Sequence, residues 1–229
     1  MIEVTSRKRS ARSWCDGLES QDVSARKFLK VVSMEKDFRS AVPDNLHPHE
    51  FLVKKLKKRG IMVKAQSFSD MSGFFVESQS PEDVEKYWNA EVITAVRENH
   101  LEALRKMHAE GRPLQCHNKF GESLLHLACR KQRIEVVDFL LNEVKVSAAV
   151  RDDFGRTPLH DACWTPVPNF KLVDCILKKC PDLLYVKDKR GHTPLFYGRQ
   201  NHWESWIRHL EERIQLLAPK HQSLLVKEE

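Results

Sequence analysis

Apolar residues recur at helical spacing along the second half of the chain. Residues three and four positions apart share one face of a helix, so each apolar run indicates a helix with one buried side. Four such runs occur: Leu104 and Met107; Val136, Val137, Leu140 and Leu141; Leu172, Val173, Ile176 and Leu177; and Trp206, Ile207 and Leu210. The last run continues through Ile214 and Leu217. We therefore expect a longer final helix that closes one end of the fold.

Residues 152–164 encode a turn, a helix cap and a short helix. Asp152 and Gly155 stand at the first and last positions of a four-residue turn, where these residue types are favoured. Thr157 can cap the next helix through its hydroxyl, and Pro158 suits the first helical position because no amide donor is needed there. The stretch thus predicts a turn that leads directly into a helix.

The same pattern occurs twice more, at residues 118–129 and 188–196. The turn glycines are Gly121, Gly155 and Gly191, so the copies are 34 and 36 residues apart. A repeat of about 33 residues that contains Thr-Pro-Leu-His is the signature of ankyrin repeats. On these residues, the chain resembles an ankyrin-repeat protein over roughly residues 86–217. It has about four repeats, and the first and last depart from the pattern, as end repeats do.

The resemblance implies an all-α fold, an ankyrin-repeat solenoid of helix-turn-helix units. The turns that begin the repeats would form short turn or β-hairpin fingertips. A small mixed or partly disordered N-terminal region precedes this solenoid. We divide the chain into a disordered basic N-terminus (1–23), a helical or mixed region (24–80), the ankyrin-repeat domain (81–217) and a polar tail (218–229).

The region 24–80 is predicted from short apolar patterns. We expect a helix from about Ser24 to Phe38 and a basic helix that Gly60 ends. The apolar runs at 61–63 and 73–76 are short enough to be strands. Whether this region docks on the repeats is left open by the sequence.

The net charge of +6 is concentrated before the repeats. Residues 1–80 hold 15 Lys and Arg against 10 Asp and Glu, and the densest cluster spans residues 54–59. Such a run can act as a nuclear import signal or a nucleic-acid contact. Phe51, Leu52 and Leu56 lie at helical spacing beneath it, which favours the solvated face of an amphipathic helix.

The six cysteines are expected to be buried free thiols. Cys129 and Cys163 share one repeat position that favours a small buried residue, and Cys175 and Cys180 lack the spacing of a zinc-binding pair. No apolar run is long enough for a transmembrane helix, and the N-terminus lacks the apolar stretch of a secretory signal. We therefore expect an intracellular protein, in the cytoplasm, the nucleus or both, without membrane contact.

The sequence contains no recognisable catalytic, cofactor-binding or metal-binding motif. His126 and His160 recur at one repeat position, and the resemblance implies that each bonds to the neighbouring turn and cap. A catalytic base would not be copied from repeat to repeat without a matching nucleophile. We expect no enzymatic activity, no cofactor and no metal.

The resemblance also implies a concave groove, lined by fingertips and inner helices, that selects a protein partner. The candidate residues, mapped by repeat position, are Lys119, Phe120, Asp153, Phe154, Lys189 and Arg190 at the fingertips and Arg130, Lys131 and Trp164 at the ends of inner helices. The two phenylalanines could instead pack between adjacent turns. Trp164 and Phe170, which flank an insertion, could instead cover the helix ends. The cations favour an acidic or mixed-charge partner segment.

Two classes of function follow from these patterns. The leading hypothesis is a non-enzymatic protein–protein interaction module, a scaffold or adaptor that uses the concave ankyrin surface. The alternative is a nuclear regulatory protein whose basic 54–59 segment contacts nucleic acid or an import receptor. Binding to DNA or RNA that weakens steeply with added salt would distinguish the alternative.

Overall fold

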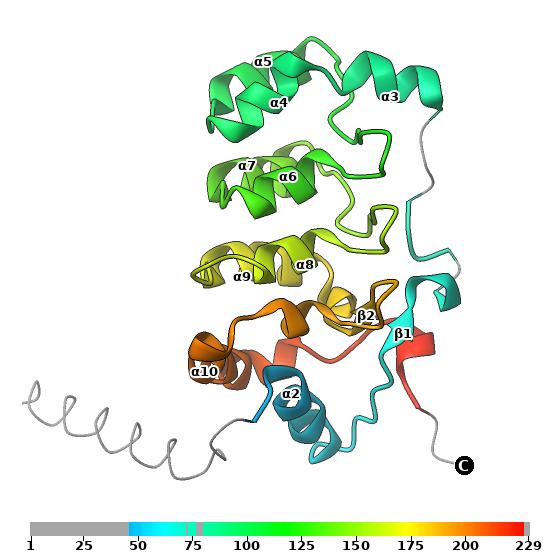
Figure 1. Ribbon diagram of the computed structural model, residues 1–229, viewed down its shortest axis with the longest axis vertical. Coiled ribbons are helices and arrows are strands. Elements are labelled where there is room, and N and C mark those ends of the chain that lie inside the picture. Colours follow the sequence, from blue (N-terminus) through cyan, green and yellow to red (C-terminus); the bar gives the residue numbers. More distant parts are fainter. Residues whose placement is uncertain (1–45, 72, 77–79, 227–229) are drawn as a thin grey trace, which may run out of the picture. The chain divides into compact units, whose positions relative to one another are not determined.

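The computed structural model describes residues 46–71, 73–76 and 80–226, which lie in one compact unit spanning Asn45–Glu229. The expected disordered N-terminus and the helix from Ser24 to Phe38 lie outside the described residues. Within this unit, pairs of helices are stacked one on another in a column (Figure 1). The all-α ankyrin solenoid expected from the sequence is confirmed.

The helices follow the repeats in order along the column. The first repeat contains α4 (Ala90–Arg97) and α5 (Leu101–Ala109), preceded by α3 (Pro81–Tyr87). The second contains α6 (Leu124–Arg130) and α7 (Ile134–Asp138), which continues as a π-helical turn, η2 (Phe139–Glu143). The third contains α8 (Pro158–Cys163) and α9 (Phe170–Lys179), followed by the 3₁₀ turn η3 (Pro181–Tyr185). The fourth contains the 3₁₀ turns η4 (Pro194–Tyr197) and η5 (Gln200–His202), then α10 (Trp203–Arg213) and η6 (Ile214–Leu216).

The apolar runs expected from the sequence form the core between the repeats. Every residue of the four runs is buried, from Leu104 in α5 to Leu210 in α10. Burial of each such side chain contributes about 1.5–3 kcal/mol, so stacking is stabilised mainly by these contacts. Ile214 and Leu217 are also buried, but α10 ends at Arg213 and the chain tightens into η6. With 11 residues, α10 is the longest α-helix in the described part of the chain, as expected, but its α-helical part does not continue to residue 217.

Each fingertip begins with an Asn or Asp whose side chain closes the turn. Oδ1 of Asp152 accepts hydrogen bonds from the amides of Phe154 at 2.9 Å and Arg156 at 2.8 Å. Asn118 and Asp188 accept equivalent pairs of bonds in their own fingertips. Asp152 therefore serves the turn, as the sequence indicated.

Successive fingertips are joined by backbone hydrogen bonds. The amide of Asp153 donates to the carbonyl of Phe120, and the amide of Lys189 donates to the carbonyl of Phe154, each at 2.9 Å. Gly121 lies beside the first of these junctions, with φ at 74°. A Cβ atom there would come within 3.1 Å of a backbone carbonyl oxygen of the next repeat. Glycine is therefore required both by the left-handed conformation and by the closeness of the next fingertip.

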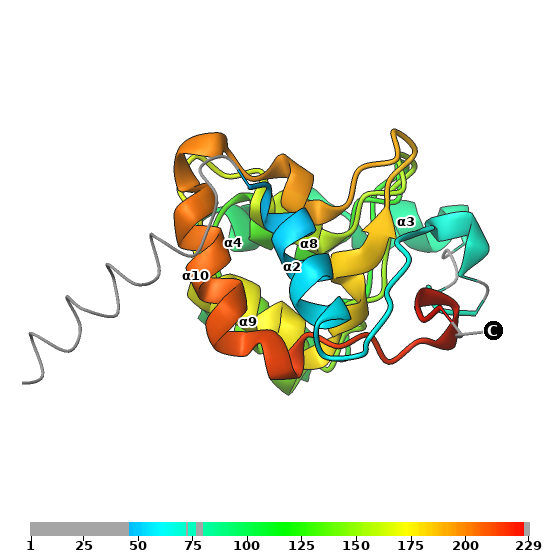
Figure 2. The same ribbon diagram turned by 90° about the horizontal axis from the view of Figure 1, so that it is seen from below.

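Helix α2 (Pro48–Lys57) packs against α10 of the last repeat, although it precedes the first repeat in the sequence (Figures 1 and 2). Its apolar residues Phe51, Leu52 and Leu56 are buried, which confirms an amphipathic helix beneath the basic run. Lys55 forms an ion pair with Glu211 of α10. The end of the stack is therefore closed by α2 rather than by an extension of the last helix.

The segment after α2 differs from the expected pair of strands. Gly60 ends α2 in the left-handed region, as expected. Of the run at 61–63, only Val63 pairs, in a single antiparallel bridge with Leu225. The strand that forms is β1 (Gln66–Ser67), which pairs in parallel with β2 (Val186–Lys187). The run at 61–63 lies beside residues 224–226, with backbone hydrogen bonds from Lys64 to Leu224 and from Val226 to Met62, but the pairing is limited to this one bridge and forms no strand. The run at 73–76 forms no strand either.

The described part of the C-terminal segment, residues 218–226, packs on the stack. It contains a 3₁₀ turn, η7 (Gln222–Leu224), in which Leu224 is fully buried. The amides of Lys220 and His221 donate to Oδ1 of Asp182 at 2.6 and 2.9 Å. These contacts attach the end of the described chain to the third repeat.

Candidate partner-binding surface

The three aromatic candidates are each more than half exposed to solvent. Phe120, Phe154 and Trp164 expose 53%, 57% and 55% of their surface. Nζ of Lys119 lies 5.1 Å from the ring centroid of Phe120, and the guanidinium carbon of Arg156 lies at the same distance from that of Phe154. The two phenylalanines contact cations and stay open to solvent, so they are not buried between adjacent turns.

The third and fourth fingertips border a hollow of about 240 Å³. Its lining consists of Phe154, Arg156, Trp164, Asp188, Lys189, Arg190 and Tyr197. Four residues that the sequence singled out are thereby brought together. Lys119 and Phe120 belong to the second fingertip and are not part of this lining.

Three lining residues were missed by sequence reasoning. The Nε and Nη2 atoms of Arg156 lie 2.8 and 2.6 Å from Oδ2 of Asp152, so its charge is used within its own fingertip. Tyr197 donates its hydroxyl hydrogen bond to Asp188. The repeat pattern in the sequence already placed two of them, because Arg156 follows a turn glycine and Asp188 begins a fingertip. Only the fold shows that they share a hollow.

The carboxylate of Asp188 is held by donors of its own chain. Burial raises its pKa, but hydrogen bonds from Tyr197 and from the amides of His192 and Arg190 outweigh this effect and lower the pKa below its ordinary value. Burial and the contact with this carboxylate raise the pKa of Tyr197 to about 12. At neutral pH, Asp188 is therefore charged and Tyr197 is neutral.

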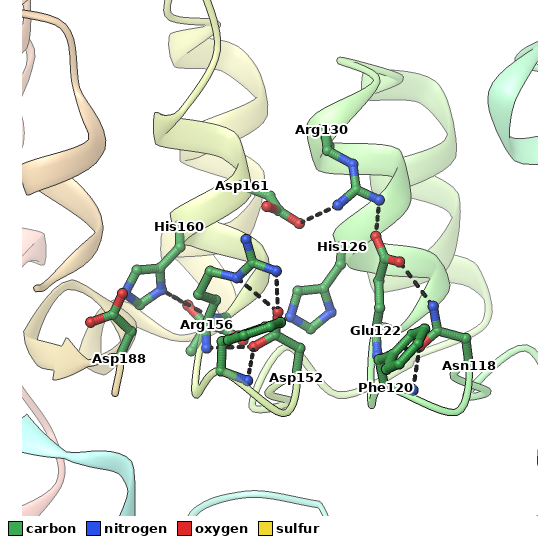
Figure 3. Close-up of polar contacts among 12 residues, drawn as sticks. Asn118, Phe120, Glu122, His126, Arg130, Asp152, Arg156, His160, Asp161 and Asp188 are labelled. Atoms are coloured by element: carbon green, nitrogen blue, oxygen red, sulfur yellow. Dashed lines mark hydrogen bonds and ion pairs between the residues drawn. The ribbon is translucent and has the colours of Figure 1, made fainter. Parts of the chain in front are cut away.

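The repeat histidines connect each inner helix to the next fingertip (Figure 3). Nδ1 of His126 accepts from the amide of Ser123 at 3.1 Å, so the neutral ring carries its proton on Nε2, which lies 3.0 Å from the carbonyl oxygen of Arg156. His160 makes the equivalent contacts in the third repeat: its Nδ1 accepts from the amide of Thr157, and its Nε2 lies beside the carbonyl oxygen of His192. Burial is the main cause that lowers the pKa of each histidine to about 4. Both are neutral structural links, as the resemblance implied.

Arg130, a candidate partner-binding residue, is engaged within the chain. Its guanidinium forms ion pairs with Glu122 of the second fingertip and, at 3.7 Å, with Asp161 of α8 (Figure 3). Asp161 is almost fully buried, and burial raises its pKa to about 6 although Arg130 opposes the shift. Arg130 therefore joins the second and third repeats. Its neighbour Lys131 and the fingertip residue Asp153 are both exposed.

The two aromatic residues that flank the insertion at 165–170 have different environments. Phe170 stacks on His209 with ring centroids 4.3 Å apart and meets Trp206 edge-on at 5.1 Å. Its role is packing against α10. Trp164 instead lies at the end of α8 and faces the hollow.

The basic run on α2 presents its cations to solvent at the end of the stack. Lys54, Lys57, Lys58 and Arg59 are exposed. Lys55 is half-buried in its ion pair with Glu211. Cations in the last turn of a helix are favoured by its dipole, so the run also has a structural use.

The described cysteines are free thiols. Cys116, Cys129 and Cys163 are buried, and burial raises the pKa of each thiol. Cys175 and Cys180 are only half-buried, so the expectation of buried thiols was wrong for these two. Among the described residues, no three His, Cys, Asp or Glu side chains gather in a way that could hold a metal. None of the helices in the described ranges combines the length and apolar character needed to span a bilayer.

Comparison with known proteins identifies the repeats. Residues 92–182 match a family model described as ankyrin repeats, in three copies. The chain is 32% identical over 109 residues to human SMC5-SMC6 complex localization factor protein 1. The aligned segment covers 48% of this chain and 10% of that protein. It is 36% identical over 78 residues to the probable 26S proteasome regulatory subunit p28 of Saccharomyces cerevisiae, which covers 34% of this chain and 33% of that protein.

A third relative is the inhibitor of Bruton tyrosine kinase from Xenopus laevis. It is 29% identical over 107 residues, which covers 45% of this chain and 8% of the relative. The matched segment thus spans a third or less of each of these relatives. Taken with the stacked helix pairs and linked fingertips, the family match shows that residues 92–182 of this chain form ankyrin repeats.

Proposed function

We propose that this chain is a non-enzymatic protein–protein interaction module, a scaffold or adaptor that binds its partner through the fingertips and inner helices. Stacked repeats create extended concave surfaces that such proteins use for binding. The relatives described above are a complex localization factor, a probable regulatory subunit and a kinase inhibitor. Each is named after another protein or complex, which supports an interaction role here.

The observation that carries this proposal is the exposure of Phe120, Phe154 and Trp164 beside cations. Single exposed apolar side chains are ordinary. Tryptophan, tyrosine and arginine are enriched in binding hot spots. Within the described chain, Lys189 and Arg190 have exposed side chains with no ion pair of their own. An acidic or mixed-charge protein segment therefore complements this face.

Charge reversal on this face tests the proposal. The variant carries Lys119→Glu, Lys189→Glu and Arg190→Glu in the full chain, and proteins captured from cells are compared by quantitative mass spectrometry. The matched control carries Lys54→Glu, Lys57→Glu and Lys58→Glu, the same charge change on α2.

We expect the fingertip variant to lose its specific partners and the α2 variant to keep them. The fingertip variant should unfold at the same urea concentration as the natural chain, because its three side chains are exposed. The α2 variant should remain folded but unfold at a slightly lower urea concentration, because it places negative charges in the last turn of the helix. A folded fingertip variant that captures its partners unchanged would show that the site lies elsewhere. Fractionation of the same cells tests the accompanying proposal that the protein is intracellular, in the cytoplasm, the nucleus or both.

A second candidate function rests on the exposed cations of α2. Lys54, Lys57, Lys58 and Arg59 are all solvent-facing and could contact phosphates. This function requires binding to DNA or RNA whose logarithmic affinity falls with logarithmic salt concentration, with a slope of about −0.9 per neutralised phosphate on duplex DNA. Absence of binding at low salt would rule it out.

A further inference from the structure

The hollow between the third and fourth fingertips has the size of one side chain. Its volume of about 240 Å³ lies below the ~300–1,000 Å³ of pockets that hold drug-sized molecules. Phe154 and Trp164 supply its large apolar surfaces, and each is more than half exposed. An apolar side chain that entered the hollow would cover both rings.

The local backbone holds Trp164 beside this hollow. Its amide donates to the carbonyl of His160 at 3.0 Å at the end of α8. The insertion that follows folds back on itself, because the hydroxyl oxygen of Thr165 lies 3.2 Å from the carbonyl oxygen of Ala162 and 3.0 Å from that of Val167, and its one hydrogen is donated to these acceptors. The insertion therefore leaves the indole exposed instead of covering it.

The charges around the hollow fall into two groups. Arg156 is bound to Asp152, and Asp188 accepts from Tyr197 and two amides, so these charges are satisfied within the chain. Lys189 and Arg190 differ. Their side chains are exposed and form no hydrogen bond or ion pair with any residue in the described part of the chain.

Two adjacent cations beside an apolar hollow define what the site can recognise. A guanidinium can bind a carboxylate through two parallel hydrogen bonds, and a lysine adds a second positive charge. Binding hot spots are enriched in tryptophan, tyrosine and arginine and lie in well-packed pockets, and all three residue types line this hollow.

We infer that the hollow receives one bulky apolar side chain, such as Phe or Leu, from an acidic segment of the partner. Lys189 and Arg190 hold the carboxylates next to that side chain. The inference rests on the proposed function and deepens it, because it names the repeat junction that anchors the partner and the motif that the partner carries.

The test uses the full chain and short fluorescein-labelled acidic peptides, with binding followed by fluorescence anisotropy. One peptide has a central Phe among Asp and Glu residues, the second has Ala in place of Phe, and the third has Asn and Gln in place of the acids. The protein variants are Trp164→Ala and the control Leu216→Ala, which removes an exposed apolar side chain of η6 that does not line the hollow. Thermal unfolding of each variant verifies that it is folded.

We expect the Phe peptide to bind about tenfold more tightly than the Ala peptide and the neutral peptide to bind weakly. Trp164→Ala should remove the preference for Phe, whereas Leu216→Ala should keep it. Equal binding of the Phe and Ala peptides, with loss of both upon charge reversal of Lys119, Lys189 and Arg190, would overturn the anchor hollow and leave the proposed function intact. No binding by any acidic peptide would overturn the hollow and the acidic partner together.

Discussion

Nδ1 of His49 lies 3.0 Å from the hydroxyl oxygen of Thr193, although the two residues are 144 positions apart. In the second and third repeats, the capping Ser or Thr contacts the histidine three residues later in the same helix. The fourth repeat has Phe196 at that position. A histidine from α2 therefore supplies the missing partner, and the ring of His47 stacks on Phe196 with centroids 4.2 Å apart.

Replacement of His49 by Ala should destabilise the fold. The Thr193 hydroxyl is nearly fully buried, and loss of its partner leaves a buried polar group unsatisfied, which costs about 1–3 kcal/mol. The free energy of unfolding from urea titrations measures this effect. Lys54→Ala, an exposed change on the same helix, is the control and should shift it by less than about 0.5 kcal/mol. Equal values for the two variants would contradict the role of His49.

Removal of α2 should weaken the last repeat more strongly than any single change. A chain of residues 81–229 lacks Phe51, Leu52 and Leu56, which are buried against the stack, and so exposes apolar surface of α10. We expect a lower urea midpoint and a tendency to aggregate, because exposed contiguous apolar surface promotes association. A chain of residues 46–229 retains the cap and should unfold like the full chain. If residues 81–229 are equally stable, α2 does not close the stack.

Arg130→Gln should act mainly on the stability of the fold and not on binding. The change leaves the nearly buried carboxylate of Asp161 without its ion-pair partner. Because the Arg130 side chain is about a third exposed, solvent screens the pair, and we expect the free energy of unfolding to fall by about 1–3 kcal/mol. Lys131→Gln is the matched control, because the adjacent lysine is exposed. Urea titration separates the two. An unchanged stability for Arg130→Gln would instead leave Arg130 as a candidate contact of the partner.

The stability of the fold should fall as the pH falls from about 6.5 to about 4. Burial lowers the pKa of His126 and His160 to about 4 in the folded state, whereas the unfolded histidines titrate near 6.5. In this window the unfolded chain binds more protons, so protonation favours unfolding by up to about 3 kcal/mol for each histidine. Asp161 acts in the opposite direction, because its pKa is raised to about 6 in the folded state. Its protonation therefore stabilises the fold as the pH falls.

Urea midpoints measured across that pH window test the balance of these groups. We expect a net loss of stability at acid pH, because two fully buried histidines outweigh one aspartate. His160→Gln should flatten the dependence on pH while it lowers stability at neutral pH. A midpoint that rises on acidification would mean that Asp161 or another group dominates.

Local chemistry determined which segments became helices and turns. The repeating apolar positions, the turn glycines and the caps at Ser123 and Thr157 act over three or four residues, so their structures follow from neighbouring residues alone. The buried faces of α5, α7, α9 and α10 were predictable for this reason. The structural role of His126 and His160 followed from their recurrence and from the resemblance to ankyrin repeats.

Tertiary structure decided how the ends of the stack are closed and which exposed residues meet. The sequence determined that residues 48–57 form an amphipathic helix, but an apolar face does not specify what it packs against. The contact between His49 and Thr193, the ion pairs of Arg130 and the grouping of Trp164 with Arg190 each join different repeats or elements. Such contacts depend on how whole repeats stack in space, and the spacing of neighbouring residues in the sequence does not determine that arrangement.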